Sequence, residues 1–338
     1  MPSDQTRPTL FSARVEASPI ETMRAIAVLL LVTYHVIGAG PRDGLAVDYP
    51  HGLRVFSDFF IDLRMPVFAF VAGFVYGLRP VAPSALGRFL TGKLRRLAIP
   101  GAIAATLFFL ALTVMEGRPI AEIWRIYLFP FAHYWFLQAI LVIFAVFCTL
   151  DVATRGRFAE AFLLVACVLT LSPIDIPGGP FSVNSAIYLL PYFILGTVVV
   201  RRYALLRQYM VVILPIALIA AAAATWQNLG LLQETGALST ERRDLQSLSF
   251  GIAACVIGIL VLPRLGWLAW LGPPSFTIYL YHVFATSGMR QALEAVGVTQ
   301  TVLFMVCGIA AGVLLPIILH WMAGQTALTR RLVLGQRR

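Results

Sequence analysis

The chain consists largely of long apolar stretches that are separated by short polar turns. A helix needs about 20 consecutive apolar residues to cross the hydrocarbon core of a bilayer, so stretches of about 17–25 residues are typical of membrane spans. Stretches of roughly this kind occupy residues 23–39, 56–78, 97–115, 134–150, 158–171, 186–200, 209–226, 248–262, 267–284 and 298–321. The fifth, sixth and eighth are short, which a tilted or partly re-entrant helix would explain. The pattern predicts an all-α fold, a polytopic membrane protein with about ten transmembrane helices.

Composition indicates a lipid environment rather than an aqueous one. Hydrophobic residues make up 59% of the chain and charged residues 12%, and the mean hydropathy is +0.83. Soluble domains carry about 25% charged residues, so this chain has too little polar surface to cover a water-soluble body of its size. The formal net charge of +10 would suggest a nucleic-acid partner in a soluble protein. Here the arginines flank the apolar stretches, so we interpret them as topology signals and predict no nucleic-acid partner.

The distribution of basic residues predicts how the chain is oriented. With the N-terminus placed in the cytoplasm, seventeen Arg and Lys residues fall in inner segments and seven in outer loops. Short cytoplasmic loops are enriched in basic residues, so both termini are predicted to be cytoplasmic. Three parts follow: a cytoplasmic N-terminal segment at 1–19, a transmembrane domain at 20–325 and a basic cytoplasmic tail at 326–338. The N-terminal segment lacks the features of a signal peptide, so the first span is expected to be retained in a multi-pass inner-membrane protein.

The cysteines give no sign of a metal site. Cys148, Cys167, Cys255 and Cys307 all lie inside apolar stretches, and none forms a CxxC pair. We therefore interpret them as small core residues and predict neither a bound metal nor a disulfide framework.

Two ionisable residues interrupt the first apolar stretch. A charged side chain at mid-helix costs at least about 2.5–3.5 kcal/mol on insertion scales, so such residues usually face a polar cavity. Arg24 and His35 are eleven positions apart, which places them on one helix face and roughly 16 Å apart along the axis. The prediction is an arginine near the inner surface and an imidazole about half to two-thirds of the way across. The alternative is a snorkelling arginine, together with a histidine whose hydrogen bonds are made to a neighbouring helix.

The second apolar stretch carries Asp58, Asp62 and Arg64 in its outer half. Helix geometry places Arg64 near the depth of His35. Pro66 and Gly73 weaken this helix locally and let another group approach it. The alternative is a structural ion pair between Asp62 and an arginine.

Two further segments place polar side chains next to apolar stretches. His133 and Trp135 lie where the chain enters the fourth span, where an interfacial aromatic belt explains the tryptophan and where a surface histidine needs no function. His282 lies deep in the ninth span, with Ser275 and Tyr279 before it. We predict that Trp135, Ser275, Tyr279 and His282 line a polar route through the membrane.

Lys93, Arg95 and Arg96 form a basic cluster ahead of the third span, at the inner surface. Clustered cations at this depth bind lipid phosphates or the phosphates of a cofactor. Considered by charge alone, the cluster is better explained by binding to lipid phosphates than by binding to a cofactor.

Several of these segments, in this order, resemble the acyltransferase-3 family of integral-membrane acyltransferases. The resemblance rests on Glu21, Arg24 and His35, on Arg64-Met65-Pro66-Val67-Phe68 with Ala72-Gly73, on Arg95, Arg96 and Pro100, on Trp135-Phe136-Leu137, and on Trp270-Leu271-Gly272 with Ser275, Ile278, Tyr279, Leu280 and His282. It covers nearly the whole chain. Glutamate replaces the commoner aspartate at the first motif, and Ala72 replaces a serine, so any role for that hydroxyl is absent.

The resemblance implies a membrane O-acyltransferase that moves an acyl group from cytoplasmic acyl-CoA to a hydroxyl of an extracytoplasmic glycan. Acetyl-CoA is the default donor, and a succinyl donor is the other candidate. His35, Arg64 and Asp62 are the implied catalytic residues, with His35 acting as a base or as a covalent acyl carrier.

The same resemblance assigns the remaining sites. Arg24, Lys93, Arg95 and Arg96 are expected to bind acyl-CoA, while Glu21 and the four route residues above are expected to line the substrate channel. Membrane lipid and a glycan or lipid-linked oligosaccharide are the expected partners. The competing class is a transporter or flippase of a lipid-linked or anionic substrate, since intramembrane charges and broken helices also occur there. The sequence leaves the acyl group, the acceptor and the oligomeric state open.

Overall fold

The computed structural model describes residues 19–41 and 43–336. Nearly all of the predicted N-terminal segment 1–19 lies outside the described residues, as do Arg42, Arg337 and Arg338. The helices are α2 (Ile20–Ile37), α3 (Gly52–Phe59), α4 (Ile61–Leu78), α5 (Leu86–Glu116), α6 (Arg125–Leu128), α7 (Trp135–Ala153), α8 (Ala159–Leu171), α9 (Val183–Arg201), α10 (Tyr203–Gln208), α11 (Met210–Thr235), α12 (Leu245–Val261), α13 (Gly266–Ala269), α14 (Ser275–Ala295), α15 (Thr301–Ala323) and α16 (Ala327–Leu334). Short 3-10 turns, among them η3 (Ala132–Tyr134), join some of them.

The predicted all-α membrane fold is confirmed, because the described residues contain helices and no strand. Within them, seven helical stretches are long and apolar enough to cross a membrane: Ile20–Ile37, Gly52–Leu78, Pro83–Glu116, Ile120–Ala153, Pro180–Arg201, Met210–Thr235 and Thr301–Ala323. The helices α8 and α12 are apolar but shorter. A total of ten spans and two cytoplasmic termini remain predictions.

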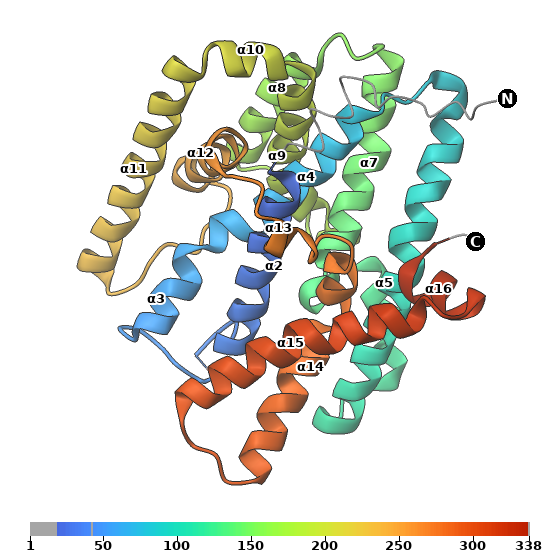
Figure 1. Ribbon diagram of the computed structural model, residues 1–338, viewed down its shortest axis with the longest axis vertical. Helices are drawn as coiled ribbons and strands as arrows, with labels where there is room; N and C mark the ends of the chain where they lie inside the picture. The colour runs from blue at the N-terminus through green and yellow to red at the C-terminus, as the bar shows by residue number, and fades with distance from the viewer. Residues whose placement is uncertain (1–18, 42, 337–338) are drawn as a thin grey trace, which may run out of the picture.

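The helices form one bundle with two ends. In Figure 1, α10 lies at the top, and the turn from α14 to α15 lies at the bottom. We call the end with α10 the inner end and the opposite end the outer end, following the predicted orientation. The helices α4 and α9 have the most buried membrane stretches, whereas α11 lies at the rim.

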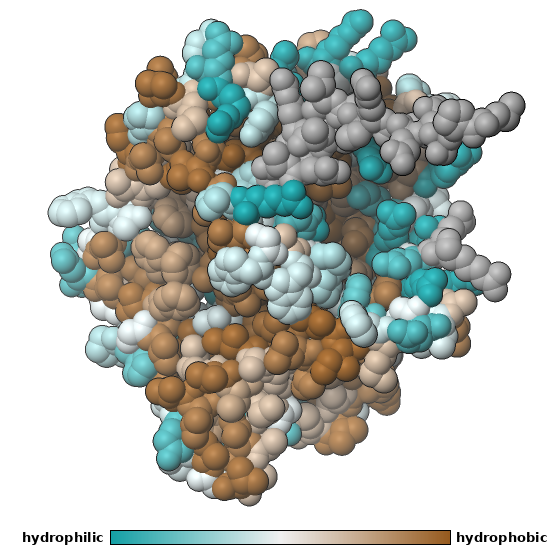
Figure 2. Space-filling model, viewed as in Figure 1, coloured by the Kyte–Doolittle hydropathy of each residue, from teal (hydrophilic) through white to brown (hydrophobic). Residues whose placement is uncertain are grey.

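The surface of the bundle matches a lipid environment. Apolar side chains spread over much of the visible face, including α15, while hydrophilic residues gather toward the inner end and one edge (Figure 2). Large exposed apolar residues on α11 and α15 include Val211, Trp226, Val306 and Trp321. Apolar surface of this extent is stable only where lipid covers it.

Close backbone contact joins α4 to α9 at the centre of the bundle. A Cβ atom added at Gly73 would lie 1.8 Å from the carbonyl oxygen of Phe193, and one at Gly196 would lie 2.1 Å from that of Phe70. The Thr197 hydroxyl also donates a 3.0 Å hydrogen bond to the Gly73 carbonyl. Small residues let membrane helices approach in this way, so the expectation that Gly73 admits a neighbouring group is met by α9.

A partly buried ion pair joins the inner ends of three helices. The Asp151 carboxylate on α7 accepts two hydrogen bonds of 2.7 Å from the Arg201 guanidinium on α9, in a bidentate pair. The Tyr76 hydroxyl on α4 donates a further 2.7 Å hydrogen bond to it. A bidentate guanidinium–carboxylate pair whose carboxylate accepts a further hydrogen bond is the geometry that best stabilises charges shielded from water.

The basic cluster before the third span lies on a helix rather than in a loop. The helix α5 has 31 residues, which corresponds to about 46 Å and exceeds the roughly 30 Å hydrocarbon core. Its first turns therefore project at the inner end. The predicted tail also folds in part: α16 packs against α5, and a Cβ at Gly335 would lie 2.7 Å from the Arg96 Cα (Figure 1).

Candidate active site

Three histidines from distant parts of the chain meet inside the outer half of the bundle. His35 lies in the last turn of α2, His133 lies in η3 just before α7, and His282 lies on α14. The ring centroids of His35 and His282 are 4.8 Å apart, those of His133 and His282 are 5.0 Å apart, and those of His35 and His133 are 5.7 Å apart. His35 is thus closer to the outer end of its helix than its predicted depth.

The tautomer of His282 follows from its hydrogen bonds. Its side chain is 0% exposed, and its Nδ1 lies 2.9 Å from the carbonyl oxygens of both Ile278 and Tyr279. Carbonyl oxygens only accept hydrogen bonds, so Nδ1 carries the proton. The Nε2 atom is buried and has no hydrogen-bond partner within residues 19–41 and 43–336. In the neutral ring this atom offers a lone pair to the histidine cluster.

His133 is buried, contrary to the expectation of a surface histidine. It is 6% exposed, and its carbonyl oxygen accepts a hydrogen bond from the Tyr279 hydroxyl. The next residue, Tyr134, donates a 3.0 Å hydrogen bond to the carbonyl of Leu280. These bonds fasten η3 to α14 and hold the His133 imidazole against the cluster.

Arg64 lies in the first turn of α4, just after the break at Phe60 that separates α3 from α4. Its guanidinium carbon lies 3.8 Å from the centroid of the Tyr34 ring, next to His35 in sequence. Stacking on an aromatic face holds a guanidinium in place without neutralising it. Arg64 therefore remains a positive group beside the histidines.

Asp62 points to a different neighbour from the one expected. Its Oδ1 accepts a 2.7 Å hydrogen bond from the Ser247 hydroxyl on α12. Within the described residues it makes neither an ion pair with an arginine nor a hydrogen bond to His35. The suggested ion pair is thus not formed, and a role for Asp62 in orienting His35 has no direct contact to support it.

Four of the predicted site residues, His35, Arg64, Trp135 and Tyr279, share one cavity of about 580 Å³. The unassigned His133 lines the same cavity. Its rim is formed by outer loops, which contribute Asp43, Arg118 and Arg242. A second cavity of about 550 Å³ also reaches His35 and Asp43. His35 therefore lies where two outward-facing cavities meet.

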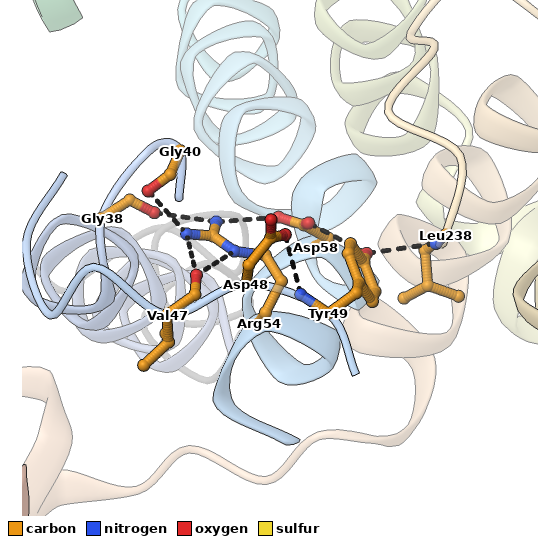
Figure 3. A network of polar contacts seen from close by, with 8 residues as sticks. All are labelled: Gly38, Gly40, Val47, Asp48, Tyr49, Arg54, Asp58 and Leu238. Atoms are coloured by element: carbon orange, nitrogen blue, oxygen red, sulfur yellow. Dashed lines mark hydrogen bonds and ion pairs between the residues drawn. The ribbon is translucent and has the colours of Figure 1, made fainter. Parts of the chain in front are cut away.

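A buried arginine holds the outer loop that follows His35, and the sequence analysis missed it. Arg54 is 3% exposed and donates hydrogen bonds to the carbonyl oxygens of Gly38 (2.9 Å), Gly40 (2.9 Å) and Val47 (3.2 Å). Its Nη1 atom also pairs with an Asp58 carboxylate oxygen at 3.6 Å. Figure 3 draws this network. These bonds fix the loop that carries Asp43 to the cavity rim.

Tyr49 extends the same network to a second outer loop (Figure 3). Its hydroxyl donates to Asp58 at 3.0 Å and accepts from the Leu238 amide at 3.1 Å. Burial raises the pKa of Tyr49 to about 12, so the hydroxyl stays a neutral donor at physiological pH. The loop after α2 and the loop before α12 are thereby joined at the rim.

The predicted inner residues form a separate group. Arg24 pairs with Glu21 at 3.2 Å, as expected from the sequence. The Ser275 hydroxyl donates to the carbonyl of Gly272 at 2.6 Å, and a Cβ at Gly272 would lie 1.9 Å from a carboxylate oxygen of Glu21. The structure thus places Glu21, Arg24 and Ser275 around the turn before α14. Along α2, Glu21 and Arg24 lie about three to four helical turns from His35.

A third cavity runs between α5 and α7 from the basic cluster toward the histidines. It has a volume of about 590 Å³, is mostly apolar, and is lined by Lys93 at one end and Tyr134 toward the other. The Lys93 ammonium lies 4.2 Å from the centroid of Phe144. The Tyr134 ring adjoins the His133 ring, with centroids 4.0 Å apart, so one aromatic side chain separates this groove from the histidine cavity.

The three predicted phosphate-binding cations do not share one face. Residues two apart on a helix point in nearly opposite directions, so Arg95 points away from the groove that Lys93 lines. Arg96 is three positions from Lys93 and exposed, on the neighbouring face. Of these three cations, Lys93 is the one that lines the groove.

Comparison with known families identifies the family of the chain. A family profile described as an acyltransferase domain matches residues 19–321. The chain belongs to the acyltransferase-3 family. No curated protein and no solved structure matches the chain.

The family motifs coincide with the features that the bundle brings together. The first motif ends in His35, the second begins at Arg64 and ends at the α4–α9 contact of Gly73, and the last ends in His282. Within the described part of the chain, no group of three His, Cys, Asp or Glu side chains is arranged to hold a metal ion. The acyltransferase-3 motifs thus converge on imidazoles and one guanidinium.

Proposed function

We propose that this acyltransferase-3 protein moves an acyl group, acetyl by default, from cytoplasmic acyl-CoA to a hydroxyl of an extracytoplasmic glycan, in the cell inner membrane. The observation that supports this most is the apolar groove between α5 and α7, which leads from Lys93 to the wall of the histidine cavity. A pantetheine arm is thin and flexible, so it suits such a groove. Its phosphates then stay at the inner end, near Lys93 and Arg96.

In the proposed reaction, His35 takes the proton from the acceptor hydroxyl while the hydroxyl oxygen attacks the thioester carbonyl carbon. The carbon–sulfur bond then breaks, and the proton passes from His35 to the departing CoA thiolate. Arg64, in the same cavity, stabilises the negative charge that develops on the carbonyl oxygen. General-base help is typically worth about 10²–10⁴-fold in rate.

A covalent variant uses the same residue as the nucleophile. The imidazole of His35 attacks the thioester first, CoA leaves, and the acceptor hydroxyl then attacks the acyl-imidazole. Acid quenching of the enzyme with acyl-CoA but no acceptor distinguishes the two routes, because only the covalent route leaves an acylated His35 for mass spectrometry.

The test is glycan-dependent release of the CoA thiol by the purified protein in proteoliposomes. We expect His35→Ala to lower this rate by about 10²–10⁴-fold at normal protein levels. The control is His320→Ala, because His320 bonds to Thr277 on the far side of α14 at 2.8 Å and does not line the cavity. An unchanged rate in His35→Ala would remove His35 from the chemistry, and a wild-type protein that releases no thiol would favour the transporter alternative.

A further inference from the structure

The lining of the histidine cavity carries an excess of positive charge. Its outer part includes the cations Arg64, Arg118 and Arg242 and, as an acid, only Asp43 among the described residues. Arg118 pairs with Glu116 at 2.9 Å, and Arg64 is stacked on Tyr34. Arg242 is left without an acidic partner within residues 19–41 and 43–336.

The carboxylates near Arg242 are used elsewhere. Asp244 accepts a 2.7 Å hydrogen bond from the Ser247 amide and caps the N-terminus of α12. Asp62 accepts from the Ser247 hydroxyl and does not line the cavity. The Arg242 guanidinium thus keeps its hydrogen-bond donors available toward the cavity.

The chain directly after Arg242 is fixed at two consecutive residues. The adjacent Arg243 donates hydrogen bonds to the carbonyl oxygens of Thr170 (3.3 Å), Leu169 (3.4 Å) and Ser172 (3.0 Å), so it serves as a structural anchor. The next residue, Asp244, caps α12 and holds the chain there. Of these two consecutive arginines, Arg243 therefore anchors the loop and Arg242 faces the cavity.

Trp135 lies beside this arginine on the same cavity wall. The Arg242 guanidinium carbon is 5.7 Å from the centroid of the Trp135 ring. An indole face packs well on the apolar face of a sugar ring, and a guanidinium binds carboxylate or phosphate oxygens in a two-pronged geometry. Together the two side chains suit a sugar that carries a negative charge.

We propose that Arg242 and Trp135 form the acceptor subsite and that the acceptor is an anionic glycan, with a carboxylate or a phosphate on the sugar that binds there. This inference rests on the proposed function, since it names the substrate class of the same cavity. The subsite lies at the outer end, whereas Lys93 and Arg96 lie at the inner end, so the anion of the acceptor does not compete with the phosphates of CoA.

Glycan binding to the purified full-length protein in nanodiscs tests this without acyl-CoA. The probes are a neutral glucose oligosaccharide, the same oligosaccharide with one glucuronic acid, and the same oligosaccharide with one phosphate. A hydrogen bond to a charged group in a shielded site corresponds to about a tenfold to hundredfold change in affinity. We expect wild type to bind at least one charged probe about tenfold or more tightly than the neutral probe, and the better probe identifies the anion.

The variants separate the role of Arg242 from general charge at the outer surface. Arg242→Gln is expected to abolish the preference, and Arg242→Lys to retain part of it. Arg290→Gln, which removes an outer arginine paired with Glu294 at 3.0 Å, is expected to leave the preference unchanged. Equal affinities in wild type, no binding of any probe, or a preference that survives Arg242→Gln would overturn the inference. A protein that binds charged glycan through Arg242 but releases no CoA thiol would refute the proposed function alone.

Discussion

Replacement of Gly73 by alanine is expected to separate α4 from α9 and to destabilise the bundle. The added Cβ would lie 1.8 Å from the carbonyl oxygen of Phe193, which belongs to a helix backbone and cannot rotate away. Restoring a contact of at least 3.0 Å requires the helices to move apart by about 1.2 Å. Overpacking of this kind costs about 1–3 kcal/mol, and the better helix propensity of alanine recovers at most about 1 kcal/mol.

The assay for this variant is unfolding in mixed micelles by SDS titration, with helicity as the readout. We expect a net loss of about 1–2 kcal/mol in the free energy of unfolding. The matched control is Gly230→Ala on α11, where an added Cβ meets nothing within 4 Å. It should be neutral or stabilising by up to about 1 kcal/mol. Acyl transfer should fall as well in Gly73→Ala, because α4 carries Arg64. Equal stabilities for the two glycine variants would refute the close contact of α4 with α9.

Two further perturbations test the inner end of the bundle. Lys93→Gln combined with Arg96→Gln should raise the KM for acyl-CoA and leave kcat nearly unchanged, because the proposed phosphate site is far from the reacting carbonyl. Arg88→Gln on α5 is the control, and an unaltered KM would contradict the proposed phosphate site. Asp151→Asn should lower the free energy of unfolding by about 3 kcal/mol, because it leaves Arg201 without its bidentate partner. An unchanged midpoint in SDS titration would show that this ion pair adds no stability.

Hydropathy predicted the helices well where an apolar run ends at a polar turn. The run at 23–39 corresponds to α2 (Ile20–Ile37), and the run at 298–321 corresponds to α15 (Thr301–Ala323). It failed for α5, which begins at Leu86 instead of near residue 97. The first turns of α5 carry Lys93, Arg95 and Arg96, so they do not register as apolar although they continue the same helix.

The candidate active site was predictable from the sequence only in part. His35, Arg64 and His282 stand out in the sequence because ionisable groups inside apolar stretches are costly. His133 precedes its stretch, and its burial depends on hydrogen-bonding contacts with residues of α14 that are 146 positions away in sequence. Neither hydropathy nor local residue spacing predicts a contact between residues so far apart in sequence.

Arg54 and Arg242 were missed because of where they occur. An arginine in a predicted loop is interpreted as a topology signal. The sequence around it does not distinguish a solvated side chain from a buried one. Only the folded loops show that Arg54 binds three carbonyl oxygens and that Arg242 faces the cavity.

The position of α16 affects where the protein can be truncated or tagged. The family match ends at residue 321, but α16 returns to α5 and brings Gly335 against the backbone of Arg96. A truncation at the family boundary would remove a helix that packs against α5 next to Arg96, a predicted donor-binding residue. An affinity tag placed after residue 338 would start within a few residues of that contact. Kinetic constants for the donor are therefore best measured on full-length protein whose tag has been removed.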